Sequence, residues 1–354
     1  MGILAAEFGR LPDGRPVTEH TLTNRSGASA SILDYGGIVT RILVPDRFGA
    51  LGDVTLGYDR FEGYLANPGF LGALVGRVGN RIREGRFALN GIEYRLARNA
   101  GGHHLHGGAV GFNAKLWAAE PYSDASGDHL RLRYTSPDGE EGYPGELRVT
   151  VTYSWNEDNE LRIRYEAVSD RDTLCNLTNH AYFNLEGEGS GPIDGHFMTI
   201  FADRITAADR DLIPTGEILD VSGTPFDLRS GARIGDGLAR VADDELMGYG
   251  KGYDHNFALN GYGEGVRHVA TASAPVSGRI MEMHTDLPGA QFYTANMMRT
   301  ALPGRCGRPY GPRDGFCFET QFYPDSPNRP EFPDSVLRAG AAYRSETAYR
   351  FRHA

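Results

Sequence analysis

The sequence predicts an all-β protein: one large antiparallel β-sandwich of two packed sheets, with few short helices. Apolar and polar residues alternate in several segments, which is the pattern of strands that bury one face. The 354 residues include 47 glycines and 19 prolines, a composition typical of many strands joined by tight turns. Helical periodicity is scarce, and its best candidate is a turn or two around residues 235–244.

Strands are predicted along the whole chain. Residues 87–96, FALNGIEYRL, predict a hairpin in which Asn90-Gly91 forms a two-residue type I′ turn and Leu89 lies opposite Ile92. Further strands are predicted wherever apolar side chains take every second position, at residues 130–136, 147–155, 161–167, 253–259, 290–296 and 315–323. No linker-like tract divides the chain, so we predict a single domain over residues 1–354.

Charge and composition narrow the class of function. The 36 Lys and Arg against 46 Asp and Glu give a formal net charge of −10, which argues against nucleic acid as a partner. No stretch approaches the roughly 20 apolar residues of a membrane span, and the N-terminal residues lack a secretory-signal pattern. The 3 cysteines are too few and too unevenly spaced for a disulfide framework or a zinc site. We therefore expect a protein of the reducing cytoplasm with no membrane partner.

Residues 175–185, CNLTNHAYFNL, combine a core pattern with hydrogen-bonding side chains. In an extended chain, successive side chains point to opposite faces. One face is then mostly apolar, and the other carries a polar row of Asn176, Thr178, His180, Tyr182 and Asn184. This pattern predicts the wall of a polar binding cleft.

The same parity argument singles out one carboxylate in residues 315–323. Glu319 takes the face opposite to three phenylalanines of its own strand. Burial beside apolar groups raises the pKa of a carboxyl, whereas cations lower it. Glu319 is therefore either a functional group in a cleft or a glutamate of the sheet face paired to an arginine.

Two further strands present polar groups on one face. In residues 253–259, Asp254 shares the ligand-facing side with an asparagine, while His255 falls on the core side. In residues 290–296, Gln291 and Tyr293 share a face, which is a possible binding surface or an ordinary mixed strand.

Two glycine-containing segments carry further candidates. His104 and His106 have a spacing that could bring two imidazoles to one metal, but a zinc site needs more ligands. We expect no metal there, and instead a loop that offers one imidazole to a polar ligand. The alternative for His103 and His104 is that they are solvated loop histidines. Asn80 and Arg81 form either a plain basic loop or an amide and a guanidinium fork aimed at hydroxyl oxygens.

Six motifs, in order, resemble those of the aldose 1-epimerases, also called galactose mutarotases: GRVGNRI (76–82), LHGG (105–108), NLTNHAYFNL (176–185), GYDHNF (252–257), PGAQFYTAN (288–296) and FCFETQFYPDSPN (316–328). The resemblance implies a single β-sandwich of the galactose mutarotase type, a supersandwich. It also implies an isomerase that interconverts the α and β anomers of free aldoses, such as glucose and galactose, without a cofactor. The reaction is acid/base-catalysed ring opening and closure.

The resemblance also implies roles for single residues. His180 is the general acid and Glu319 the general base, so we expect His180 protonated, Glu319 ionised and a bell-shaped pH dependence. The residues expected to hold sugar hydroxyls are Asn80, Arg81, His106, Tyr182, Asp254 and Gln291. The partner is a free aldose, and the protein is a monomer or a homodimer.

Three alternatives stay open at this stage. A glycoside hydrolase would use Glu319 and Asp254 as its two carboxylates. A sugar-binding protein would keep the cleft without catalysis. An epimerase of phosphorylated hexoses would need several cations in the cleft, of which only Arg81 can be named.

Overall fold

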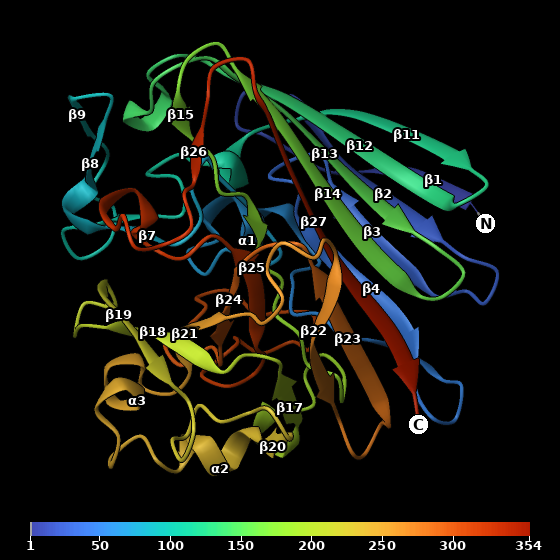
Figure 1. Ribbon diagram of the computed structural model, residues 1–354. Helices are drawn as coiled ribbons and strands as arrows, with labels where there is room; N and C mark the ends of the chain where they lie inside the picture. The colour runs from blue at the N-terminus through green and yellow to red at the C-terminus, as the bar shows by residue number, and fades with distance from the viewer. Residues whose placement is uncertain (1) are drawn as a thin grey trace.

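A computed structural model describes residues 2–354, which form three main antiparallel sheets (Figure 1). The largest sheet has nine strands, in the spatial order β11 (Ala118–Asp124), β12 (Gly127–Ser136), β13 (Leu147–Trp155), β14 (Glu160–Ser169), β27 (Ala342–His353), β23 (Arg279–Thr285), β22 (Arg267–Ser273), β17 (Phe197–Ile200) and β20 (Ala232–Arg233). One five-stranded sheet has the order β1 (Gly2–Arg10), β2 (Pro16–Thr23), β3 (Ser29–Leu33), β4 (Val39–Pro45) and β5 (Leu51–Asp53). The other has the order β19 (Pro214–Asp220), β18 (Arg204–Ala208), β21 (Asp254–Ala258), β24 (Gly289–Tyr293) and β25 (Cys317–Gln321).

The remaining elements are short. Short two-stranded sheets are formed by β6 (Leu74–Val75) with β16 (Thr178–Asn179), β7 (Arg81–Ile82) with β10 (His104–Leu105), β8 (Arg86–Leu89) with β9 (Ile92–Arg95), and β15 (Thr173–Leu174) with β26 (Val336–Leu337). The helices are α1 (Phe61–Ala66), α2 (Ile234–Leu238) and α3 (Glu245–Gly250). The predicted helical turns at 235–244 correspond to α2, whereas α1 and α3 were not predicted. Within residues 2–354, every helix is too short or too polar to cross a membrane.

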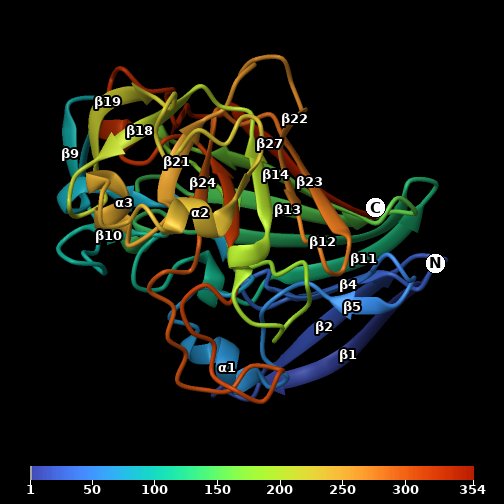
Figure 2. The ribbon, with the colours of Figure 1, turned by 90° about the horizontal axis from the view of Figure 1, so that it is seen from below.

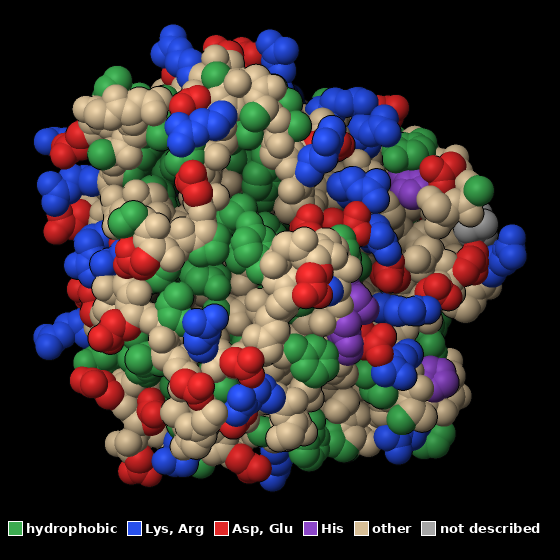
Figure 3. Space-filling view, in the orientation of Figure 1, with side chains coloured by type: hydrophobic (Ala, Val, Ile, Leu, Met, Phe, Trp, Pro, Cys, Tyr) green, Lys and Arg blue, Asp and Glu red, His purple; other side chains and the backbone are tan. Residues whose placement is uncertain are grey.

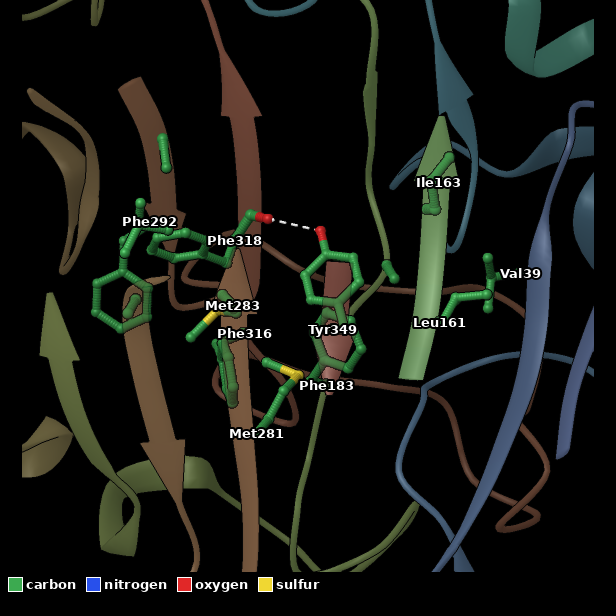
Figure 4. Close-up of a cluster of buried hydrophobic side chains, with 14 of the residues drawn as sticks. Val39, Leu161, Ile163, Phe183, Met281, Met283, Phe292, Phe316, Phe318 and Tyr349 are labelled. Atoms are coloured by element: carbon green, nitrogen blue, oxygen red, sulfur yellow. Dashed lines mark hydrogen bonds between the residues drawn. The ribbon is translucent and has the colours of Figure 1, made fainter. Parts of the chain in front are cut away.

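The nine-stranded sheet buries one face and exposes the other. Leu161 and Ile163 of β14 and Tyr349 of β27 are at most 1% exposed and face the core (Figure 4). Between them on the outer face, Arg162 forms an ion pair with Glu346, with an Nη1–Oε1 distance of 2.6 Å. This alternation is the period-2 pattern from which the strands were predicted.

Both five-stranded sheets contribute to the same core against this buried face. Ile32 of β3 and Phe292 of β24 belong to one continuous cluster with the residues of β14 and β27. The Tyr349 hydroxyl donates a hydrogen bond to the Phe318 carbonyl of β25 at 2.9 Å (Figure 4). Figure 2 shows the two smaller sheets well apart from each other. The predicted antiparallel sandwich is confirmed, with its second layer divided between two sheets; the single domain over residues 1–354 stays a prediction.

The hairpin of β8 and β9 forms as predicted. Leu89 pairs with Ile92 across the turn, and Asn90 and Gly91 have φ angles of 52° and 78°. Positive φ at both central residues is the requirement of a type I′ turn.

On the face of the molecule in Figure 3, acidic and basic side chains are interspersed over most of the surface. Such mixing differs from the single-sign basic surface of a nucleic-acid-binding protein. That nucleic acid is not a partner stays a prediction from the net charge of −10.

Candidate active site

The structure brings all of the predicted site residues to one hollow of about 260 Å³. Loops, β7 and the sheet that contains β25 all contribute to its lining. The predicted residues that line it are Asn80, Arg81, His106, His180, Tyr182, Asp254, Gln291 and Glu319.

Three adjacent strands, β21, β24 and β25, form the floor. Gln291 of β24 lies directly opposite Glu319 of β25, and Asp254 of β21 lies opposite Tyr293 of β24. Because alternate residues of a strand share a face, this register places their side chains on one surface. The parity argument thus identified the correct face of each strand.

His255 lies on the other side of β21, as its parity predicts. It is 2% exposed, and its ring centroid is 4.5 Å from that of Phe226. Its Nδ1 accepts a hydrogen bond from the Asp254 backbone N–H at 3.0 Å. Burial lowers the pKa of His255 to about 4. This histidine therefore belongs to the core.

The polar row of residues 175–185 is only partly a cleft wall, and the prediction of one long strand there is wrong. Only Thr178–Asn179 is a strand. Asn176 is turned to the backbone of Phe322, and the Asn184 side chain donates to two backbone carbonyls. These amides thus satisfy backbone carbonyls of neighbouring irregular segments, which have no strand partner of their own there. Of the row, only His180 and Tyr182 line the hollow.

His180 and Glu319 face each other. The distance from His180 Nε2 to Glu319 Oε1 is 3.6 Å, and both side chains are at most 5% exposed. Burial raises the pKa of Glu319 well above its usual value, and the charge of Asp254 raises it further. Burial also lowers the pKa of His180 to about 4. The surroundings therefore favour the neutral form of each group.

Aromatic rings fix the imidazole of His180 in this position. The ring of Phe70 stacks on it with an interplanar angle of 27° and a centroid distance of 5.9 Å. The ring of Tyr182 lies at 5.0 Å, and that of His106 at 5.1 Å. Packing on several sides leaves the imidazole little rotational freedom.

Asp254 is held by two of the other predicted residues. Gln291 Nε2 donates to Asp254 Oδ1 at 2.6 Å, and Arg81 Nη2 lies 4.0 Å from Asp254 Oδ2. Glu319 Oε2, by contrast, has no hydrogen-bond partner among residues 2–354. The alternative of a sheet-face glutamate paired to an arginine is therefore wrong for Glu319, because the nearby guanidinium lies against Asp254.

The loop residues of the hollow adopt uncommon backbone conformations. Phe70, Asn80 and His106 have φ angles of 56°, 61° and 50°. The Asn80 backbone N–H donates to His106 Nδ1 at 3.2 Å, so a neutral His106 carries its proton on Nε2. Left-handed backbone at bulky residues costs free energy and persists where the surrounding structure enforces it, often at functional sites.

The tautomer of His106 bears on metal binding. Three possible ligand atoms, one each from His106, His180 and Glu319, lie within 4.8 Å of one another. This separation could suit a metal ion. With Nδ1 occupied by the Asn80 N–H and the proton on Nε2, however, His106 has no free lone pair to offer. These three residues do not fit a resident metal in this arrangement.

The alternative of a solvated loop histidine is wrong for His104. His104 is fully buried, with Nδ1 2.8 Å from the Ala97 carbonyl oxygen and Nε2 2.6 Å from the Tyr143 hydroxyl. His103 is half-buried, and its Nδ1 accepts the Glu84 backbone N–H at 3.0 Å. His103 and His104 therefore anchor the loop that carries His106. Strand parity could not predict this role, because the segment is rich in glycine and not a regular strand.

Gly107 allows the same loop to lie close to the backbone of Gly76. It has a φ of 86°, and a Cβ placed on it would lie 1.8 Å from the Gly76 carbonyl oxygen. We expect Gly107→Ala to lower the free energy of unfolding by about 3 kcal/mol, measured by chemical denaturation. Gly101→Ala is the control, since Gly101 also has positive φ but open space around it, and should cost only about 1–2 kcal/mol. Equal costs for the two variants would contradict the close approach at Gly107.

Sequence reasoning missed some of the lining. Phe70, Met297 and Met298 contribute apolar surface to the hollow. They lie in irregular segments without period-2 patterning, so no sequence signal distinguished them from ordinary loop residues.

Comparisons with known proteins identify the family of the chain. The family model described as "Aldose 1-epimerase" matches residues 18–350. The protein named galactose mutarotase of Bos taurus is 42% identical over 351 residues, which cover 99% of each chain. The aldose 1-epimerase of Escherichia coli K12 is 36% identical over 96% of each chain. The crystal structure of galactose 1-epimerase from Lactobacillus acidophilus NCFM superposes with a TM-score of 0.87 at 29% identity, covering 99% of each chain. From the matching family model and these identities, the chain belongs to the aldose 1-epimerase family.

Proposed function

We propose that this protein is an isomerase that interconverts the α and β anomers of free aldoses, such as glucose and galactose. The observation that carries the proposal is the opposition of one imidazole and one carboxyl group, 3.6 Å apart, in a hollow lined by polar side chains. Anomer exchange needs one proton to leave the C1 hydroxyl and another to reach the ring oxygen. An acid and a base placed on either side of the reacting centre perform both transfers.

Glu319 acts as the base and His180 as the acid. Glu319 takes the proton of the C1 hydroxyl while His180 Nε2 gives a proton to the ring oxygen, and the bond between C1 and the ring oxygen breaks. The resulting aldehyde rotates about its C1–C2 bond. Closure from either side, with both proton transfers reversed, forms either anomer and returns each proton to its origin.

The other polar residues suit a neutral polyol. Asp254 accepts from sugar hydroxyls, and its carboxylate is held for this role by Gln291 and Arg81. His106 offers Nε2–H as a donor, because its Nδ1 is occupied by the Asn80 N–H. The ring of Tyr182 packs against the apolar C–H face of the sugar. A phosphorylated substrate would need additional cations at this site.

The acid and base roles suggest a protonated His180 and an ionised Glu319, whereas burial favours the neutral form of both groups. An ion pair of protonated His180 and ionised Glu319 holds one proton, and so does the neutral pair that burial favours. The two arrangements differ only in the position of that proton. A C1 hydroxyl that donates to Glu319 and a ring oxygen that accepts from Nε2 both stabilise the charged arrangement.

The activity of the pair should therefore have a bell-shaped pH profile with a broad plateau. On the acid side, activity falls as a second proton binds His180, whose pKa is about 4, because no base then remains. On the basic side, activity falls as the single shared proton is lost, at a pH above the usual pKa of a glutamate. The measurement is kcat against pH with glucose. A profile that rises from pH 4 through pH 8 would contradict the assignment of His180 and Glu319 as a pair that shares one proton.

Polarimetry tests the function directly. Freshly dissolved α-glucose or α-galactose should reach its equilibrium rotation faster with the protein than without it. Chromogenic glycosides incubated with the protein should release no aglycone. Aglycone release with an unchanged rate of mutarotation would favour a glycoside hydrolase. Saturable sugar binding without faster mutarotation would favour a non-catalytic binding protein.

A cytoplasmic location is proposed from the low cysteine content and the reducing environment that it suggests. A monomer and a homodimer are both compatible with the proposed chemistry, since every named residue comes from one chain. Analytical ultracentrifugation would distinguish the two states.

A further inference from the structure

The imidazole of His180 contacts strand β25 at two places. Nε2 lies 3.6 Å from Glu319 Oε1, and Nδ1 lies 3.4 Å from Cys317 Sγ. Cys317 and Glu319 are two residues apart on β25, so their side chains point to the same face. One strand therefore supplies a partner for each nitrogen of the same ring.

The thiol is the partner of Nδ1 in a site closed to solvent. Cys317 is 0% exposed, and its Sγ is the side-chain atom that lies within hydrogen-bond distance of Nδ1. Burial raises the pKa of Cys317 well above its usual value, and the charge of Glu319 adds to this effect. Cys317 therefore stays a neutral thiol, whose sulfur is a weak acceptor.

We propose that Cys317 is a positioning residue, whose Sγ accepts a hydrogen bond from Nδ1–H of His180 and leaves Nε2 as the nitrogen that exchanges its proton. The inference rests on the proposed function, in which His180 Nε2 donates to the ring oxygen. The hydrogen bond that one ring nitrogen makes decides which tautomer is present. With Nδ1 keeping its proton throughout, Nε2 alone alternates between donor and acceptor during ring opening and closure.

A thiol also suits the strength of acid that the reaction needs. A carboxylate at Nδ1 would stabilise the imidazolium and make it a weaker acid. A neutral thiol gives no such stabilisation, so protonated His180 remains a strong acid toward a weakly basic ring oxygen. This is consistent with the lowered pKa of His180.

Nitrogen-15 NMR of labelled histidines tests the tautomer without any assay of activity. At neutral pH we expect His180 of the wild-type protein to be protonated on Nδ1, and Cys317→Ala to move the proton to Nε2 in a measurable fraction of molecules. A wild-type His180 protonated on Nε2 would overturn the inference. If Cys317→Ala does not fold, the wild-type spectrum and that of Cys317→Ser still decide it.

Kinetics then separate a positioning role from a packing role. Cys317→Ala should lower kcat about tenfold with little change in KM, and Cys317→Ser, which keeps an acceptor, should recover most of the loss. Cys175→Ala is the matched control, because Cys175 is also buried but lies in the core away from the hollow. It should lower the melting temperature without lowering kcat.

The outcomes for the two proposals are distinct. A wild-type protein without mutarotase activity would contradict the proposed function and leave the NMR result for Cys317 readable. An active wild-type protein whose Cys317→Ala variant keeps full kcat and an unchanged tautomer would contradict the role of Cys317 alone.

Discussion

Glu319→Gln should reduce kcat for mutarotation by about 10²- to 10⁴-fold, the usual contribution of a positioned general base. The amide has nearly the shape of the carboxyl group but cannot accept the proton of the C1 hydroxyl. Because Glu319 is 2% exposed and burial disfavours its charge, the amide should fit the site without lowering the melting temperature. Optical rotation of α-galactose, followed at saturating sugar, measures the effect.

Sugar binding distinguishes the base role from a binding role. The dissociation constant for glucose, measured by calorimetry, should change little in Glu319→Gln. Glu346→Gln is a matched control, because Glu346 is also largely buried but forms ion pairs with Arg162 and Arg164 on the outer sheet face. That control should lose some stability and keep its kcat. A Glu319→Gln variant that folds but no longer binds glucose would identify Glu319 as a binding residue instead.

His180→Asn should lower kcat by a similar factor of about 10²–10⁴. The asparagine amide can still donate a hydrogen bond to the ring oxygen but cannot release a proton to it. The fall in activity at low pH should move upward from the pKa of His180, about 4, to the raised pKa of Glu319, because ionised Glu319 is then the remaining proton acceptor. Residual activity, measured by polarimetry between pH 3 and pH 9, should therefore rise as Glu319 ionises and show no basic limb, because the variant has no acid whose proton could be lost.

A second buried histidine provides the control for this variant. His196 is 1% exposed, and burial lowers its pKa to about 4 as well. Its Nε2 accepts the Leu185 backbone N–H at 2.9 Å, outside the hollow. His196→Asn should destabilise the fold and leave the pH profile unchanged. An unchanged acid limb in His180→Asn would remove His180 from the acid role.

Much of the candidate site could be predicted from strand parity. Asp254, Gln291 and Glu319 lie on regular strands, where alternation fixes the face of each side chain before any contact is known. The same rule assigned His255 to the core. Parity works here because the strands are continuously paired, so their pleat is regular.

The rule failed where the backbone departs from a ladder. Residues 175–185 are mostly irregular, and Asn176 and Asn184 bind backbone groups instead of lining the cleft. His104 is buried beneath a glycine-rich loop through its contact with Tyr143, which is distant in sequence. The division of the second layer into two sheets also depends on long-range pairing that no local pattern encodes.

The position of β27 has a consequence for the biogenesis of the protein. Residues 342–353 pair with β14 on one side and with β23 on the other, so they occupy the interior of the largest sheet. While this segment is still inside the ribosome, β14 and β23 each present an unpaired strand edge, which is a template for association with other chains. The sheet is therefore complete only after residues 342–353 have left the ribosome, and nascent chains that stall before residue 342 should be prone to aggregation.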